Sequence, residues 1–238
     1  MSELRDIWVY LGASPLLYLT LTLVAFQAGA WVYAKGNMNP MLNPVLISIL
    51  IIVAILLVTE TDYQDYFDGA QFVHFLLGPA TVALAIPLYR QIDKVRRSAL
   101  AITVSILAGS LTASISAVGS GYLLDGSKDA LISLAPKSVT APVAMGISEQ
   151  LGGLPSLTAV LVILTGILGA MIGPFILNLI GVKEWPARGL ALGTTSHGIG
   201  TARALQVNEV AGAFAGLAMG LNALATAILL PIIWRLVF

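Results

Sequence analysis

The stretch ALGTTSHGIGTARAL, residues 191–205, places polar and basic side chains between two long apolar runs. Such groups are costly inside an apolar segment and usually serve a function there. An arginine offers a planar fork of donors to a carboxylate, and hydroxyl groups both donate and accept hydrogen bonds. The stretch therefore indicates a binding site for a small anion. Its polar side chains are Thr194, Thr195, Ser196, His197, Thr201 and Arg203.

Two further apolar segments, residues 72–89 and 130–150, are interrupted by prolines, and the second also contains Lys137. None of the three segments can be a continuous helix without backbone compensation. Non-helical backbone at membrane depth persists only where protein or water satisfies its polar groups. The second half of a broken helix begins with N–H groups at the positive end of its dipole, which attracts carboxylates and phosphates. The interruptions therefore predict where a ligand meets the backbone.

Lys137 and Arg203 are predicted to hold the carboxylate of one anion, because these two cations fall within or just after an interruption. His197 is predicted to couple proton movement or to bind a hydroxyl, since the ordinary pKa of an imidazole lies close to physiological pH. The remaining predicted contacts of the anion are with hydroxyl groups at the breaks and with a wall on the facing side of the site. The hydroxyl groups are those of Ser138, Thr140, Thr194, Thr195, Ser196 and Thr201, and the wall is Pro79 and Thr81.

Each of these residues also has a purely structural explanation. Lys137 could extend its ammonium to the membrane interface, and Arg203 could anchor the end of its segment in the cytoplasm. His197 could simply bond a neighbouring carbonyl, and Pro79 and Pro87 could kink a packing helix. The glycines of GAFAGLAMG favour close helix packing over a site. The sequence alone leaves these alternatives open.

The three interruptions resemble one another in sequence. LGPATV begins at Leu77, LAPKSV at Leu134 and LGTTSH at Leu192, with spacings of 57 and 58 residues. Repeats with broken helices are common in secondary transporters. If the interrupted segments cross the membrane fully, the repeats are parallel. If they re-enter, successive repeats are inverted.

The composition is that of a membrane protein. The chain of 238 residues is 58% hydrophobic and 10% charged, whereas soluble domains carry about 25% charged residues. It has no cysteine, which excludes disulfides and thiolate chemistry, and its zero net charge gives no indication of a nucleic-acid partner. We predict no cofactor and no metal site. Ser196 and His197 are adjacent, but neighbouring side chains on a helix point about 100° apart, so we do not expect an enzyme.

The predicted fold is all-α, a polytopic membrane helix bundle with broken or re-entrant helices and internal repeats. A membrane-spanning helix needs about 20 apolar residues. The first apolar run exceeds the ~7–15 residues of a signal-peptide core, so we expect a retained helix. We divide the chain into an N-terminal membrane helix, residues 1–35, and a transport domain, residues 36–238. The uncharged stretches of sufficient length are residues 7–34, 36–59, 98–124, 154–182 and 211–234.

Basic residues set the predicted orientation. Lys35 and the loop RQIDKVRR, residues 90–97, are basic, whereas the charged residues of the loop between them, residues 59–69, are all acidic. The positive-inside rule therefore places Lys35 and the basic loop in the cytoplasm and the N-terminus outside.

The motifs of the second half resemble the LrgB/CidB family of bacterial membrane proteins. The resemblance lies in LAPKSVTAPVAMGISEQLGGLPSLTAV, ARGLALGTTSHGIGTARAL and EVAGAFAGLAMGLNALATAILLPII, and it extends over about residues 40–233. It implies an antiholin-like or holin-like protein linked to murein hydrolase export and autolysis, beside a smaller LrgA/CidA-type membrane subunit. The plastidic glycolate/glycerate translocator contains a similar module, and bacterial relatives are associated with pyruvate uptake. The resemblance thus also implies small 2-oxo or 2-hydroxy monocarboxylates as cargo.

We therefore predict a secondary transporter of small monocarboxylates, such as pyruvate, glycolate or glycerate, in the bacterial inner membrane. The alternative is an antiholin-like pore or regulatory subunit that controls murein hydrolase export with an LrgA/CidA-type partner. A passive pore would not need paired cations at helix breaks, which favours transport. Glycine-rich helix faces are compatible with a homo-oligomer.

Overall fold

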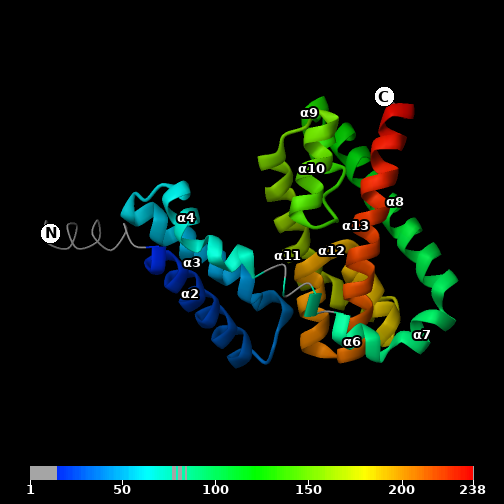
Figure 1. Cartoon of the computed structure of the whole chain (residues 1–238), viewed down its shortest axis with the longest axis horizontal. Coiled ribbons are helices and arrows are strands. Elements are labelled where there is room, and N and C mark those ends of the chain that lie inside the picture. Colours follow the sequence, from blue (N-terminus) through cyan, green and yellow to red (C-terminus); the bar gives the residue numbers. More distant parts are fainter. Residues whose placement is uncertain (1–14, 77–78, 80–81, 84, 238) are drawn as a thin grey trace, which may run out of the picture. The chain divides into compact units, whose positions relative to one another are not determined.

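The computed structural model is helical, with no strand in the part of the chain that it describes. The chain divides into two compact units, residues 1–83 and residues 84–238, and each is described by itself (Figure 1). The predicted all-α class is confirmed, while the functional boundary after residue 35 stays a prediction. The described residues are 15–76, 79, 82–83 and 85–237.

The N-terminal unit contains two long apolar helices that pack closely. A Cβ on Gly29 would lie 2.6 Å from the carbonyl oxygen of Pro44, so glycine lets the two backbones approach. The Thr22 Oγ1 and Tyr66 Oη atoms lie 2.9 Å apart and link the first helix to a third one. The helices are α2 (Pro15–Lys35), α3 (Pro44–Thr59) and α4 (Tyr63–Phe75).

The two charged loops that set the predicted orientation are not entirely loops in the structure, because part of each one is helical. In the acidic loop, α4 begins at Tyr63, and Asp62 Oδ1 accepts the Gln64 N–H at 2.7 Å, so an acidic side chain caps the helix. The basic loop, residues 90–97, begins at the last residue of α6 (Ala85–Arg90) and contains the whole of α7 (Ile92–Arg97).

The C-terminal unit is organised around three long apolar helices. All three are long and apolar enough to cross a membrane, as are Leu16–Lys35 and Pro40–Thr59 in the N-terminal unit. The five predicted spans are confirmed within the described residues; the start of the first, before residue 15, lies outside them. The three helices are α8 (Ala99–Leu123), α11 (Pro155–Leu179) and α13 (Glu209–Val237).

Two of the three predicted interruptions lie between these helices, and both are breaks. The first joins α9 (Lys128–Leu134) to α10 (Ala141–Leu151). The second lies inside α12 (Trp185–Val207), where His197 has the non-helical angles φ 41° and ψ −129°. The remaining predicted interruption, residues 72–89, falls partly outside the described residues.

The first half of α12, residues 185–196, runs alongside α13 in the same direction. A Cβ on Gly189 would collide with the carbonyl of Ala211, and a Cβ on Gly193 with that of Ala215. Contacts therefore advance along α13 as α12 advances, and glycine permits direct backbone approach.

The second half of α12, residues 198–207, runs back along α13. A Cβ on Gly198 would lie 3.9 Å from the sulfur of Met219, and Leu205 packs against Gly212. The contact positions on α13 therefore decrease as α12 continues.

The two halves of α12 thus form a hairpin that turns at His197. In a straight helix, positions eight residues apart are separated by about 12 Å. Here a Cβ on Gly200 would lie 2.5 Å from the carbonyl oxygen of Leu192. The interrupted segment therefore turns back on itself instead of continuing as one helix.

The α9–α10 segment forms a second hairpin, on the other half of α13. Leu131 and Ile132 of α9 and Ile147 of α10 share one apolar cluster with Leu230 and Trp234 of α13. The hairpin therefore packs at the C-terminal part of α13, through α10 and through side chains of α9.

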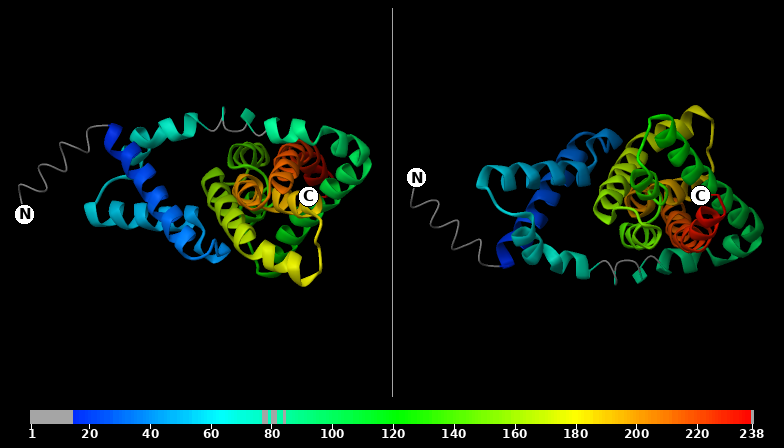
Figure 2. Two further views of the ribbon diagram at one scale, coloured as in Figure 1. Left: turned by 90° about the horizontal axis from the view of Figure 1, so that it is seen from below. Right: turned by 90° about the horizontal axis from the view of Figure 1, so that it is seen from above.

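The two hairpins approach the middle of α13 from its opposite ends. Figure 1 shows α9 and α10 at the end of the unit where α13 terminates, and α12 along the first part of α13. Figure 2 shows the same helices from both ends. The hairpin tips carry the LAPKSV and LGTTSH motifs, each preceded by a long helix, α8 or α11. Because the hairpins enter from opposite ends, these two repeats are inverted.

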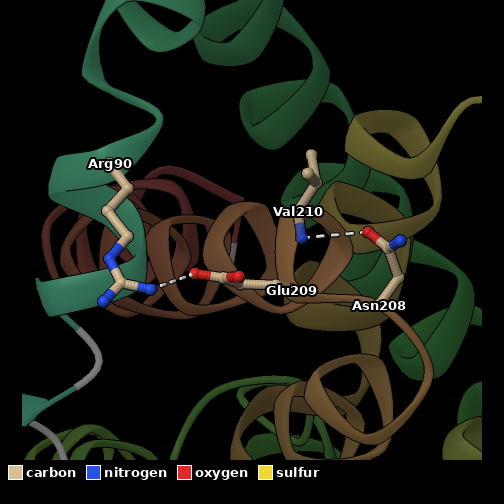
Figure 3. A network of polar contacts seen from close by, with 4 residues as sticks. All are labelled: Arg90, Asn208, Glu209 and Val210. Atoms are coloured by element: carbon tan, nitrogen blue, oxygen red, sulfur yellow. Dashed lines mark hydrogen bonds and ion pairs between the residues drawn. The ribbon is translucent and has the colours of Figure 1, made fainter.

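An ion pair attaches α6 to the start of α13 (Figure 3). The Arg90 Nη1 atom lies 2.9 Å from Glu209 Oε1, and both side chains are more than half exposed. Asn208 Oδ1 accepts the Val210 N–H at 2.9 Å and caps α13.

Candidate functional site

The tips of both hairpins meet at Asn222, near the middle of α13. Its Nδ2 donates to the carbonyl of Thr194 at 2.9 Å and to that of Ser138 at 3.2 Å. Asn222 is only 1% exposed. One amide therefore joins two segments that are far apart in the sequence.

The α12 tip is fixed to α11 through His197. The His197 Nε2 atom lies 2.9 Å from the carbonyl oxygen of Val162. A Cβ on Gly166 would lie 2.6 Å from the ring, so the imidazole occupies the space that this glycine leaves. His197 does bond a neighbouring carbonyl, as the structural alternative supposed, and its proton-coupling role stays a prediction.

The other hydroxyl groups of the α12 tip are largely engaged by the segment itself. Thr201 Oγ1 donates to the carbonyl of His197 at 2.8 Å, and Thr195 Oγ1 donates to that of Ala191 at 2.8 Å. The hydroxyl oxygens of Thr195 and Ser196 lie 3.1 Å apart. Ser196 and Thr201 are buried, whereas Thr195 is exposed.

The tip of the α9–α10 hairpin carries three of the predicted site residues. The Lys137 Nζ atom lies 3.4 Å from Ser138 Oγ, and Lys137 and Thr140 are half-buried. Val139 packs in one cluster with Val162 of α11, the residue whose carbonyl meets His197. Both tips therefore rest on the same turn of α11.

Each hairpin tip brings together the end of one helix and the start of another. α10 and the second half of α12 both begin at the tips, so two positive helix ends face the region around Asn222. The side chain of Thr140, the N-cap of α10, makes no capping hydrogen bond. The carbonyl oxygens of Ser138 and Thr194, which carry partial negative charge, accept hydrogen bonds from Asn222 Nδ2.

The remaining predicted site residues are Arg203, Pro79 and Thr81. Arg203 is half-buried on the returning arm of α12, six residues after His197, which corresponds to a helix rise of about 9 Å. Its sharing of one carboxylate with Lys137 stays a prediction. Pro79 is exposed in the N-terminal unit, and Thr81 lies outside the described residues.

A separate groove of about 560 Å³ lies between α8 and α13. Its walls are mostly apolar, with Val118 and Leu230 among them, and Ser110 and Thr226 bond each other across it at 2.9 Å. No lysine or arginine lines this groove, so it is not the predicted anion site.

Asn222 is not among the predicted site residues, although the sequence contains a signal for it. An amide in the middle of an otherwise apolar span is costly unless it is bonded. The closely packing glycines of α12, such as Gly189 and Gly193, were also missed as packing positions. By contrast, the packing role predicted for GAFAGLAMG holds at Gly212, which contacts Leu205.

The comparisons with known proteins agree with the resemblance seen in the motifs. The family model described as the LrgB-like family matches residues 22–236. The holin-like protein CidB of Staphylococcus epidermidis is 34% identical over 91% of this chain and 94% of its own length. The protein of the same name in Staphylococcus aureus is 33% identical over 92% and 95%. The uncharacterized protein YwbG of Bacillus subtilis is 36% identical over 87% and 92%. No solved structure matches the chain.

Proposed function

The chain belongs to the LrgB-like family of multi-pass membrane proteins, and we propose that its C-terminal unit carries a small carboxylate across the bacterial inner membrane. The observation that supports this proposal is the meeting of two inverted hairpins at one buried amide, Asn222. Inverted repeats with broken helices that meet at the midplane are a common architecture of secondary transporters.

The helix ends at the tips provide the binding chemistry of the proposal. In this proposal the N-termini of α10 and of the second half of α12, together with the ammonium of Lys137, bind the carboxylate. Arg203, on the returning arm of α12, is the second cation of the proposal. Movement of the hairpins against α11 and α13 would expose this region to each side in turn.

The proposal is non-enzymatic. In the described part of the chain, His197 Nε2 meets the Val162 carbonyl and Ser196 Oγ meets Thr195, so the adjacent serine and histidine do not form a nucleophile–base pair. No cofactor is required for carriage of an anion along such a path.

Uptake by liposomes containing the purified chain tests the proposal. Labelled pyruvate, glycolate and glycerate should enter faster than into empty liposomes, and Lys137→Ala should reduce uptake at least tenfold, since it removes a desolvated cation. The control is Lys183→Ala, because Lys183 is exposed in the segment between α11 and α12. Uptake equal to that of empty liposomes, or unaffected by Lys137→Ala, would contradict the proposal.

The second candidate function is that of a holin-like pore or regulatory subunit. The names of the relatives favour this alternative over a transporter, since CidB is described as holin-like and none of the names specifies a substrate. In this function the chain would act with an LrgA/CidA-type subunit and would assemble as a homo-oligomer.

Leakage of a large dye separates the two candidates. Liposomes filled with calcein, which is far larger than a C3 acid, should retain it if the chain is a carrier. Calcein release from liposomes that contain the chain, alone or with a small LrgA/CidA-type subunit, would support the holin-like function instead.

A further inference from the structure

The amide of Asn222 has only one orientation compatible with its surroundings. Its nitrogen faces the carbonyl oxygens of Ser138 and Thr194, and carbonyl oxygens can only accept hydrogen bonds. An amide turned by 180° would place Oδ1 against both of them. Both N–H groups of Asn222 are therefore used by the two hairpin tips.

The other end of the same amide is an unused acceptor. Asn222 Oδ1 is buried and has no hydrogen-bond partner within the described part of the chain. A buried acceptor without a donor is energetically costly. Asn222 joins the two tips at which α10 and the second half of α12 begin, so an anion bound at these helix ends could also bring the missing donor.

A carboxylate cannot be that donor, because its oxygens and Oδ1 all accept hydrogen bonds. A hydroxyl group next to the carboxylate can donate to Oδ1 while the carboxylate meets the helix ends and Lys137. A carbonyl in the same place would oppose Oδ1 with a second acceptor.

We propose that Asn222 is a specificity-determining residue whose Oδ1 accepts a hydrogen bond from the hydroxyl of a small 2-hydroxycarboxylate. This inference rests on the proposed function, since it names the class of anion that the same site takes. It also assigns two roles to one side chain: Nδ2 holds the tips together and Oδ1 recognises the ligand.

Three acids of equal carbon number test the inference on the wild-type chain. Lactate carries a hydroxyl at the second carbon, propionate carries only hydrogen there and pyruvate carries a carbonyl. Each acid is tested as a competitor of the uptake of a labelled substrate. Lactate should bind about threefold to tenfold more tightly than propionate, the range expected for one neutral hydrogen bond. Pyruvate should bind most weakly of the three.

Variants of Asn222 show whether this residue causes the preference. Asn222→Leu, or the smaller Asn222→Ala if the leucine variant does not fold, should bring the lactate-to-propionate ratio close to one. The control is Thr226→Val, one helical turn further along α13, where the hydroxyl bonds Ser110 instead of the tips; it should keep the ratio of the wild type.

Equal affinity for lactate and propionate in the wild type would overturn the inference and indicate that a water molecule fills the position. A preference that persists in both Asn222 variants would overturn it as well. Either result leaves the proposed function standing, whereas failure of all three acids to compete would remove both proposals.

Discussion

His197 is the residue at which the α12 hairpin turns, and its backbone shows the cost of turning. Its φ of 41° lies in a region that residues with a Cβ rarely adopt. Backbone strain of this kind costs about 1–3 kcal/mol and persists only where surrounding contacts impose it. Here the bond from the ring to Val162 and the space left by Gly166 impose it.

We predict that His197→Gly is more stable than His197→Ala by about 1 kcal/mol or more, because glycine adopts this backbone conformation without strain. Both variants lose the bond to Val162, so their difference isolates the backbone. Thermal unfolding in mild detergent measures it. The control is Ala202→Gly in the regular part of the returning arm, which should lose about 0.5–1 kcal/mol. An alanine variant as stable as the glycine variant would show that the turn is unstrained.

At the scale of the elements, the sequence predicted where the helices break, but not whether each broken segment continues or turns back as a hairpin. Prolines and hydroxyl residues within apolar runs indicated that residues 130–150 and the segment containing residues 191–205 could not form continuous helices, and both segments are broken. Whether they cross or re-enter depends on which neighbour each arm faces. That information resides in tertiary contacts such as those of Gly189 and Gly193 with α13, which a local pattern does not contain.

Gly193→Ala tests the packing of α12 on α13. The added methyl group would collide with the carbonyl of Ala215 and lie 2.8 Å from its Cα, and backbone cannot move aside as a flexible side chain can. We expect a loss of about 1–3 kcal/mol in the free energy of unfolding, as for other overpacked sites. Gly146→Ala is the matched control, because nothing lies within 4 Å of that position; in α10 it should be neutral or stabilising by up to about 1 kcal/mol. Equal stability of the two variants would contradict the close approach.

At the scale of the whole molecule, composition was sufficient for the class and the spans, because a charge content of 10% leaves too little polar surface for water. The site was only partly predictable. Ser138 and Thr194 were identified from their motifs, but their meeting depends on Asn222, which is 84 residues from Ser138 in sequence. The inversion of the two repeats likewise follows only from the opposite directions in which the hairpins enter.

The inverted arrangement predicts on which side of the membrane each hairpin begins and ends. The chain contains no cysteine, so a single introduced cysteine reports its own accessibility to a membrane-impermeant maleimide. The basic residues of α7 precede α8 directly, which places the start of α8 in the cytoplasm. The ends of the α9–α10 hairpin then lie outside and both ends of α12 lie inside.

Four exposed positions test this topology in intact cells. Lys128→Cys and Gln150→Cys should react from outside, whereas Lys183→Cys and Gln206→Cys should react only after the cells are permeabilised. The decisive comparison is Lys183 with Gln206, because these residues lie on either side of the turn at His197. Labelling of the two from opposite sides would mean that α12 crosses the membrane, and the re-entrant hairpins would be wrong. Exchange of all four accessibilities would instead reverse the predicted orientation and leave both hairpins intact, since each would still begin and end on one side.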